Sequence, residues 1–528
     1  MRTSSLARFV SILAVLAVVA VGCADSFAHL GSTNQLVVTL QGGMSDAGMP
    51  AAGSPTNRLP LTFVESQTYT LNIEAHRADG TIDPNFNGFV RLSVKPGTVL
   101  SLSGPRTSGR NAQLVAGVAD NVQVAVVGAY GDARIWAEDI GYVPADPTRQ
   151  PPPECSDGID NNNNGLVDFP VDPGCAFAND DTEDLGSYAT GVSDILYYHY
   201  PRVADVRGIG QGGAATPFPN EQVEIDTQWN GSTQATPYGV VVTRVASDGF
   251  FVTDIGDCAR GDNSLNAYNY SPPPTMRVCD RLIALVGTAS DFHGFTELGF
   301  PAWVLEEWDP TLRPCLVPEP HVFLPSELGN NQARLRQESA LVRVMRNPPP
   351  PSTDPCHPEQ HPPGFLPYTL HVGAHIGANH PDPKAGYAPT TDATNCDFNG
   401  NGKVDYVPAM GPEALCAAAC AADVECSEYS GYLGFSQFNL VLVDHSPTPL
   451  APAQALANAS TSQVFDPVVR KGQDISSFTG TLKYFSGGSQ FTIEARCDDD
   501  IVTDVTKPPL PSDKACVSAR TIADQNTF

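Results

Sequence analysis

The amino-acid sequence predicts a mostly β protein made of several domains. The chain of 528 residues contains 47 prolines and 46 glycines, residue types that end strands and form turns. Between these turn residues, short stretches rich in valine and threonine alternate apolar and polar side chains, which is the pattern of strands with one buried face. A chain of this length exceeds what one hydrophobic core usually supports, so we expect three to four domains.

The segment 35–145 is expected to form a β-sandwich, because several strands follow one another in a short stretch of chain. The stretches that alternate in the strand pattern are 36–40, 69–75, 88–94, 121–126 and 133–137. At 86–90 (FNGFV) and 137–139 (AED) the segment resembles bacterial Ig-like domains, and this resemblance implies an Ig-like sandwich.

Strands return in the segment 191–335, in an order that resembles the OB-fold domains accompanying extracellular bacterial nucleases. A strand at 238–245 precedes GFFVTD at 249–254, a strand at 280–288 and FHGFTEL at 292–298. The resemblance implies an OB-like β-barrel. Cys279 stands where that pattern usually has glycine, so we expect a disulfide to redirect this loop.

A second OB-like unit is expected in 336–528, opening with a strand at 338–344 and interrupted by an insertion at 348–434. Further strands are predicted at 438–443, 475–482 and 490–496, and one helix is predicted at 412–422, inside the insertion. The expected fold is therefore mostly β: an Ig-like sandwich plus one or two OB-like β-barrels with loop-rich, disulfide-stapled insertions.

The N-terminus has the features of an export signal. Arg2 and Arg8 precede an apolar run at 9–21, which is short for a membrane-spanning helix. The sequence AVGC at 20–23 resembles the lipobox of bacterial lipoproteins, although leucine is commoner than alanine at its first position. This resemblance implies a signal peptide at 1–22, lipidation of Cys23, a tether at 23–34 and a lipid-anchored protein of the outer membrane or cell surface. An ordinary secretory signal with an incidental cysteine is the alternative.

The cysteines agree with export, because 13 are present and 12, an even number, remain once Cys23 is set aside. Reduced thiols or zinc ligands are the alternative, but no C-x-x-C pair exists to hold zinc. Proximity in sequence suggests the bridges Cys155–Cys175, Cys258–Cys279 and Cys497–Cys516. The remaining disulfide candidates are Cys315, Cys356, Cys396, Cys416, Cys420 and Cys426.

The linker 146–190 carries the most specific motif of the chain, a candidate calcium loop. Oxygen ligands recur at alternate positions with Gly165 sixth, as in EF-hand loops, although Val171 replaces the glutamate expected at position twelve. The candidate ligands are Asp157, Asp160, Asn162, Asn164, the Leu166 carbonyl, Asp168 and Asp172. The motif resembles the cysteine-bracketed, calcium-binding-like repeats of secreted myxobacterial proteins, which are similar to thrombospondin type 3 repeats. A solvated polar linker is the alternative.

A second candidate calcium loop resembles the first half of a dockerin or EF-hand loop. Pro408 occupies its position twelve, and Glu413 could supply the missing carboxylate only if the chain turned back. Its candidate positions are Asp397, Asn399, Asn401, Lys403 and Asp405. A turn rich in Asn and Asp that binds no ion is the alternative.

The sequence contains little that indicates a catalytic site. Neither a G-x-S-x-G elbow nor a glycine-rich phosphate loop is present. Histidines gather in the insertion, but proline and glycine separate them and no H-E-x-x-H occurs, so we expect ordinary loop residues rather than a transition-metal site. They are His357, His361, His371, His375 and His380. A hydrolase with this insertion as its active site is the third of the functions considered.

The net charge of −28 disfavours nucleic acid as a partner, because nucleic-acid binders present clustered Lys and Arg to phosphate. Five aromatic residues of the first barrel could stack bases, but alternation predicts that most of them lie in its core: Phe250, Phe251, Tyr268, Tyr270 and Phe292. We therefore expect a non-enzymatic surface lipoprotein for binding, adhesion or scaffolding, with calcium-stiffened linkers, the membrane as partner through its anchor, and an unknown surface or protein ligand. The runner-up is an accessory module of an extracellular nuclease or another secreted hydrolase.

Overall fold

A computed structural model shows that the chain is mostly β, which confirms the predicted fold class. It describes residues 33–41, 52–61, 63, 65–143, 145, 152–208, 215–228, 238–260, 262–292, 294–346, 368–375, 437–443, 445, 454–460, 465, 473–485 and 490–517. The chain forms two compact units, residues 1–199 and 200–528, and each is described by itself.

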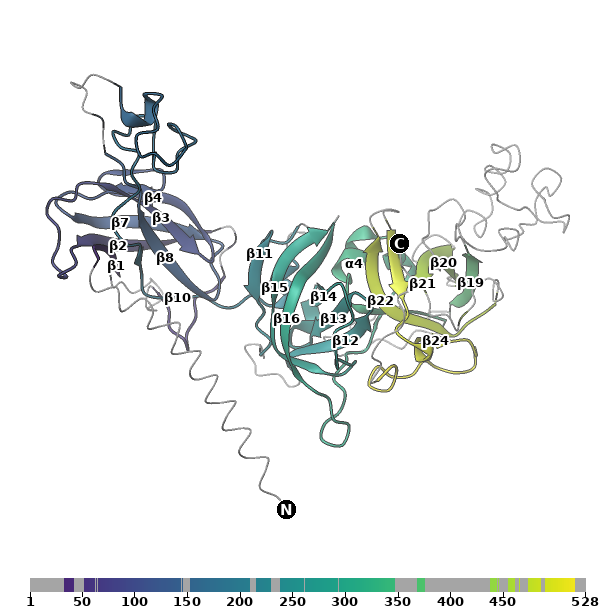
Figure 1. Ribbon diagram of the computed structural model, residues 1–528. Helices are drawn as coiled ribbons and strands as arrows, with labels where there is room; N and C mark the ends of the chain where they lie inside the picture. Colours follow the sequence, from purple (N-terminus) through teal and green to yellow (C-terminus); the bar gives the residue numbers. More distant parts are fainter. Residues whose placement is uncertain are drawn as a thin grey trace, which may run out of the picture. The chain divides into compact units, whose positions relative to one another are not determined.

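The first unit folds into two β-sheets that share one hydrophobic core and so form a sandwich (Figure 1). One sheet has the strand order β1-β2-β7-β4; the other has the order β10-β8-β3-β6-β5, with β9 also paired to β8. The strands are β1 (Gln35–Leu40), β2 (Gln67–His76), β3 (Phe89–Lys95), β4 (Thr98–Ser103), β5 (Thr107–Ser108), β6 (Asn111–Gln113), β7 (Val118–Val127), β8 (Asp132–Asp139), β9 (Gly191–Val192) and β10 (Leu196–Tyr197).

The alternation read from the sequence sets which side chains enter this core. Burial alternates along β2, so that Leu71 and Ile73 are fully buried while Asn72 between them is not. Burying an aliphatic side chain of this size contributes about 1.5–3 kcal/mol. The hydroxyl groups of Tyr69 and Tyr198 hydrogen-bond to each other at 2.6 Å, which satisfies two buried polar groups within the core.

The sandwich extends beyond its predicted end at residue 145. Both β9 and β10 pair with β8, and the backbone N–H of Leu59 donates to the Tyr197 carbonyl at 2.7 Å. Gly191 lies so close to β1 that an added Cβ would stand 2.7 Å from the Leu36 carbonyl oxygen. The prediction that the barrel begins at 191 is therefore wrong, because two-residue strands are too short to show an alternating pattern.

In the second unit, five strands close into a barrel in the order β12-β13-β14-β16-β15 and back to β12. Only β14 and β16 pair in parallel among these strands, and β11 pairs with β15 beyond the residues that pair with β12. This is the arrangement expected of an OB-like unit. The strands are β11 (Glu221–Glu224), β12 (Val240–Ala246), β13 (Gly249–Asp254), β14 (Ser264–Tyr268), β15 (Arg281–Phe292) and β16 (Phe295–Glu306).

The barrel core contains only some of the aromatic residues predicted there. Phe250 and Phe251 are buried, as expected. Tyr268 is partly buried, and Tyr270 and Phe292 are 66% and 61% exposed, so the prediction that most of the five lie in the core is wrong. Tyr270 follows the end of β14 and Phe292 ends β15, where the alternation of the strand no longer determines the direction of a side chain.

The remaining sheet of the second unit has the order β17-β18-β22-β23-β21-β20-β19, with β24 paired to β22. In the barrel, the single strand β12 pairs with both of its neighbours, β13 and β15. In this sheet, β18 pairs with β22, and a separate strand, β19, pairs with β20. The segment 348–434, predicted as one insertion, therefore contains a strand of the sheet. The strands are β17 (His321–Val322), β18 (Leu341–Met345), β19 (Thr369–His375), β20 (Gln437–Val443), β21 (Gln454–Ser460), β22 (Ser477–Phe485), β23 (Gln490–Glu494) and β24 (Ile501–Val502).

Buried polar contacts join the two sheets of the second unit. Arg244 of β12 pairs with Glu494 of β23 at 2.5 Å, and both side chains are at most 4% exposed. Arg496 donates to the Thr243 carbonyl at 3.3 Å and pairs with Asp500 at 2.8 Å. Removing one partner of such a pair leaves an uncompensated buried charge, which costs about 3–5 kcal/mol.

The structure confirms two of the suggested disulfides, Cys155–Cys175 and Cys497–Cys516. The third is wrong, because Cys279 bonds to Cys315, which lies 36 residues further along the chain. The strands β15 and β16 bring these two cysteines together, which proximity in sequence does not reveal. The side chains of the other disulfide candidates lie outside the described residues: Cys258, Cys356, Cys396, Cys416, Cys420 and Cys426.

The helices among the described residues are short. The α-helices are α2 (Val203–Val206), α3 (Pro325–Leu328) and α4 (Asn331–Arg336), and the 3-10 helices are η1 (Glu154–Ser156), η2 (Ile255–Arg260) and η5 (Asp498–Asp500). Within the part of the chain that the structure describes, no helix has the length and apolar character needed to cross a membrane. The signal peptide, the tether and the helix predicted at 412–422 lie outside that part.

Candidate metal centre

Segment 154–184 leaves the sandwich after β8 and returns to it at β9, where Figure 1 shows it as the blue lobe beyond the sheets. It is an excursion from one sheet rather than a linker between domains, which corrects the prediction for 146–190. The rings of Tyr142 and Phe177 meet edge to face with centroids 5.2 Å apart. This contact holds the second half of the segment against the sandwich.

A buried carboxylate, Asp180, fastens the same end of the segment. It accepts the backbone N–H of Val143 at 2.9 Å and that of Ala176 at 3.1 Å. Burial raises the pKa of Asp180 to about 6, although the backbone donors oppose this shift. The N–H of Asp181 also donates to the Val143 carbonyl at 2.8 Å. These hydrogen bonds tie together the two stretches of chain that lead into and out of the segment.

Three carboxylates converge in the interior of the segment. Asp160, Asp172 and Glu183 each offer an oxygen, and these oxygens all lie within 4.8 Å of one another. The side chains of Asp172 and Glu183 are both 1% exposed. The disulfide Cys155–Cys175 closes the loop that carries the first two of them.

The Glu183 side chain holds the loop in place by accepting hydrogen bonds from the backbone of the loop. One carboxylate oxygen accepts the N–H groups of Asn161 at 2.6 Å and Asn162 at 3.3 Å, and the other accepts the N–H of Asp168 at 3.1 Å. The Glu183 carbonyl accepts from the Asn162 side chain at 2.6 Å. A single side chain therefore fixes both halves of the predicted calcium loop.

Asp172 and Asp160 are also bound to groups of the loop. One oxygen of Asp172 accepts the side-chain amides of Asn162 at 3.2 Å and Asn164 at 3.0 Å. Asp160 accepts the backbone N–H of Asn164 at 3.1 Å and of Gly165 at 2.9 Å. Five oxygen-bearing side chains are thus gathered in one place: Asp160, Asn162, Asn164, Asp172 and Glu183.

The electrostatics of this cluster favour a cation. Residues 154–184 include nine acidic side chains and no Lys, Arg or His. Among the residues that the structure describes, none of the three carboxylates forms an ion pair with a basic side chain. At separations near 5 Å, each pair of ionised carboxylates repels by about 3 kcal/mol at an effective dielectric constant of 20. The amide hydrogen bonds offset part of this repulsion, and a divalent cation would reverse it.

The remaining predicted ligands lie at the edge of the cluster or outside it. Asp157 accepts the Ile159 N–H at 2.8 Å and the Asn161 side chain at 3.1 Å, and it does not join the three carboxylates. Leu166 is 38% exposed, and its N–H donates to the Asn164 side chain. Asp168 accepts the Gly158 N–H at 2.9 Å through one oxygen, while its other oxygen is buried without a partner among the described residues.

Glu183 is the site residue that sequence reasoning missed. An EF-hand places its glutamate at position twelve of the loop, and Val171 stands there. Glu183 follows twelve positions later and lies beyond Cys175, yet it is the only glutamate between Glu154 and Glu221. Its isolation in the sequence was the one signal that could have pointed to Glu183. The sequence does not show that the fold of the segment returns Glu183 to the loop.

The second predicted calcium loop lies outside the described residues, with Asp397, Asn399, Asn401, Lys403 and Asp405. Among the histidines of the insertion, which were expected to be ordinary loop residues, His357, His361 and His380 also lie outside the described residues. His371 and His375 lie on β19, two residues of one strand rather than of a helix.

One further group of potential metal ligands is explained by a disulfide bond. Cys497, Asp499 and Cys516 place their ligand atoms within 4.8 Å of one another. Because the two cysteines form a disulfide, their sulfur atoms are not thiolate ligands. Asp499 accepts the Cys516 N–H at 3.2 Å and so supports the turn at this bridge.

No protein-family model, curated protein or solved structure matches this chain. The chemistry of the Asp160, Asp172 and Glu183 cluster is therefore the main guide to function.

Proposed function

We propose that this protein is a non-enzymatic, lipid-anchored surface protein that binds or displays other surface components, and that one calcium ion stabilises its segment 154–184. The observation that carries the calcium proposal is the convergence of Asp160, Asp172 and Glu183 within 4.8 Å inside a disulfide-closed loop.

The donor set favours calcium over other biological metals. The three gathered ligands are carboxylate oxygens, which suit hard cations, and neither histidine nor a free thiolate is among them. Calcium accepts six to eight oxygen ligands in flexible geometry. The three carboxylates can supply several of these ligands, while the side-chain amides of Asn162 and Asn164 donate to Asp172. Magnesium requires a stricter octahedron and keeps several waters, so it should bind this irregular set more weakly.

Calcium would act on the stability of a surface lobe rather than on a joint between domains. The segment begins and ends on the same sheet, through β8 and β9, so ordering it fixes the shape of one end of the sandwich. A rigid, acidic and disulfide-closed lobe suits an exported protein that presents a surface to a partner. The predicted export signal and the lipobox-like sequence ending at Cys23 support this location.

Calcium titration of the oxidised full chain by calorimetry, paired with thermal melts in calcium and in excess chelator, tests this proposal. We expect saturable binding and a higher melting temperature for the transition of the first unit. At a free calcium concentration 100 times the dissociation constant, the stabilisation should be about 2.7 kcal/mol. Absence of heat, with melts unchanged by chelator, would show that hydrogen bonds alone order the loop and would refute the calcium site.

The closed barrel of β12 to β16 favours a second candidate function, that of an accessory module for a secreted hydrolase. Its strand order is the one expected from the resemblance to domains that accompany extracellular nucleases. Copurification of a hydrolase with the affinity-tagged, anchored protein would support this function. Recovery of the tagged protein without any hydrolase activity would favour the first candidate.

A further inference from the structure

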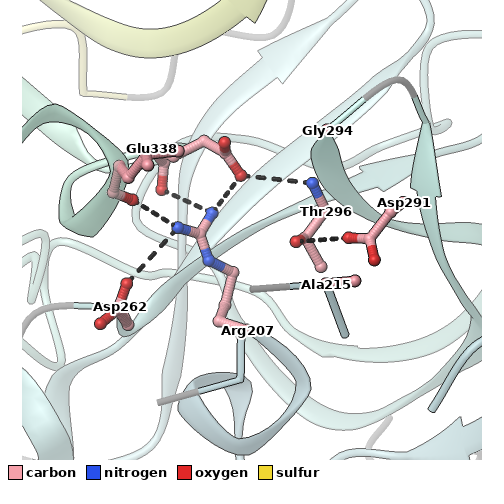
Figure 2. A pocket seen from close by; sticks show the side chains of 8 residues that line it. Arg207, Ala215, Asp262, Asp291, Gly294, Thr296 and Glu338 are labelled. Carbon is pink, nitrogen blue, oxygen red and sulfur yellow. Dashed lines mark hydrogen bonds and ion pairs between the residues drawn. The ribbon is translucent and has the colours of Figure 1, made fainter. Parts of the chain in front are cut away.

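The second unit contains a polar cavity of about 250 Å³, lined by Arg207, Asp262, Asp291, Thr296 and Glu338 (Figure 2). Its charged side chains are bound to neighbouring groups of the chain. Arg207 lies 2.5 Å from Glu338 and 3.6 Å from Asp262. Asp291 accepts the hydroxyl of Thr296 at 2.8 Å. These contacts explain the charged wall without a ligand, whereas the surface of segment 154–184 has no such explanation.

The disulfide-closed loop 155–175 distributes its side chains in the reverse of the usual order. The carboxylate Asp172 is 1% exposed, whereas its neighbour Val171 is 61% exposed. In most proteins an aspartate is exposed and a valine is buried. The exposed large apolar side chains of this loop are Ile159, Leu166, Val167, Phe169 and Val171.

Hydrogen bonds hold together the two stretches of the loop that carry these apolar side chains. The backbone N–H of Gly158 donates to the Asp168 carboxylate at 2.9 Å. The backbone N–H of Phe169 donates to the Cys155 carbonyl at 3.1 Å. Ile159, which follows Gly158, is therefore held beside the stretch of chain that contains Phe169.

The interior of the segment cannot take these apolar side chains, because the carboxylates of Asp160, Asp172 and Glu183 converge there. A bound cation would explain the polar interior, but it would not explain the apolar exterior. Apolar side chains that gather at the surface of a soluble protein mark an interaction site. The position of the segment as a lobe beyond the sheets makes its surface accessible to a partner (Figure 1).

The charge of the lobe determines which partner fits. Residues 154–184 include nine acidic side chains and no Lys, Arg or His, and one calcium ion would compensate only two of these charges. An anionic membrane surface, or the same lobe of a second copy, would therefore be repelled. A surface on which Lys and Arg alternate with apolar side chains would be attracted, and it could cover the apolar groups of the loop.

We propose that the loop 155–175 docks a basic, amphipathic segment of a partner protein. The apolar side chains of that segment pack on Phe169 and Val171, and its Lys and Arg side chains face the acidic groups of the lobe. This inference rests on the binding role in the proposed function and names the chemistry of the partner.

Calorimetric titration of the full chain with three short peptides tests the proposal, with Cys23→Ser in place so that no acyl chain contributes. The first peptide contains only leucine and lysine in the pattern of an amphipathic helix. The second has serine in place of leucine, and the third has glutamate in place of lysine. We expect saturable binding of the first that weakens as the salt concentration rises, and binding at least tenfold weaker for the other two. Equal binding of the leucine and serine peptides, or no binding of the leucine peptide, would overturn the proposal.

Substitutions in the loop place the binding on this surface. Phe169→Ser and Val171→Ser each remove one exposed apolar side chain, so each should weaken binding of the leucine peptide about tenfold. Leu312→Ser is the matched control and should bind as the wild type does, because Leu312 is 81% exposed and lies outside the lobe. Thermal melts show whether each variant is folded. Unchanged affinity in both folded loop variants would contradict the assignment.

Calcium titration of the same variants separates the docking surface from the candidate metal centre. Neither Phe169 nor Val171 belongs to the cluster of three carboxylates, so both variants should bind calcium as the wild type does. Weaker peptide binding with unchanged calcium binding supports the docking surface, whereas loss of both would show that the substitutions disturb the loop itself and would overturn it. Binding to anionic vesicles, or self-association, that both variants abolish would identify a membrane or a second copy as the occupant and would also overturn it.

Discussion

The carboxylate of Glu183 accepts the backbone N–H of Asp168 at 3.1 Å across 15 residues of sequence. Asp168 belongs to the calcium-like loop, whereas Glu183 lies beyond the cysteine that closes it. The contact shows that the loop is completed from outside its own motif, and it makes Glu183 the most informative position to change.

Glu183→Gln should weaken calcium binding at least tenfold, because it removes one of three converging charges while retaining a similar shape. Calorimetric titration of the variant measures this change. Asp184→Asn is the matched control, since Asp184 is the adjacent residue in sequence and is exposed. Equal calcium affinity in both variants would remove Glu183 from the site.

Glu494→Gln should destabilise the second unit by about 3–5 kcal/mol, because the change removes the negative charge that faces the buried Arg244 guanidinium. Glu306→Gln is the comparison: Glu306 pairs with Arg313 at the surface, where such pairs contribute about 1 kcal/mol or less. Denaturant unfolding followed by a signal from residues 200–528 measures both changes. Similar losses in the two variants would show that the Arg244–Glu494 pair is not a special anchor.

Asp254 should make the second unit less stable as the pH rises. Burial, followed by the nearby Asp257, raises the pKa of Asp254 to about 7, although the Gly256 N–H and Arg202 oppose this. The folded state therefore keeps a proton that the unfolded state releases near its ordinary pKa of 3.8. The stabilisation is full below that value and is lost as the pH rises to about 7, with a change on the order of 4 kcal/mol.

Asp254→Asn should remove this contribution to the pH dependence and keep an acceptor for the Gly256 N–H. Unfolding free energies measured between pH 4 and pH 8 for both proteins provide the comparison, with each value taken from the transition of the second unit. A difference between wild type and variant that stays constant with pH would contradict the raised pKa.

Loss of the Cys279–Cys315 bridge in the double variant Cys279→Ser, Cys315→Ser should destabilise the second unit by about 4 kcal/mol, from the entropy of a closed loop of this length. Thermal melts under oxidising conditions measure the loss. Peptide mapping of the unreduced wild type checks the pairing directly, and a peptide joining Cys258 to Cys279 would refute it.

Cys23→Ser should abolish lipidation and release the protein from the membrane, because the thiol of Cys23 is the proposed attachment point of the acyl chains. Labelling of expressing cells with a radioactive fatty acid, followed by membrane fractionation, measures both effects. Wild-type protein that is exported and cleaved but carries no label would favour the ordinary secretory signal instead.

Short-range pattern was enough to predict much of the first unit. Alternation along 69–75 predicted β2, and Leu71 and Ile73 are indeed its buried residues. Alternate Asp and Asn residues after Cys155 predicted a loop of converging oxygens, and Asp160 and Asp172 do converge. Neighbouring residues determine these features, because strand geometry and turn chemistry act over a few positions.

The sequence by itself determined that the chain is mostly β, that its Asp160 loop is acidic and closed by Cys155–Cys175, and which strands carry most of the cores. Only the tertiary structure decided that Glu183 completes that loop, that Cys279 pairs with Cys315, and that Arg207 and Glu338 wall a cavity. The physical reason is distance along the chain: local dihedral preference and side-chain alternation are short-range, whereas these contacts form only where separate segments pack together.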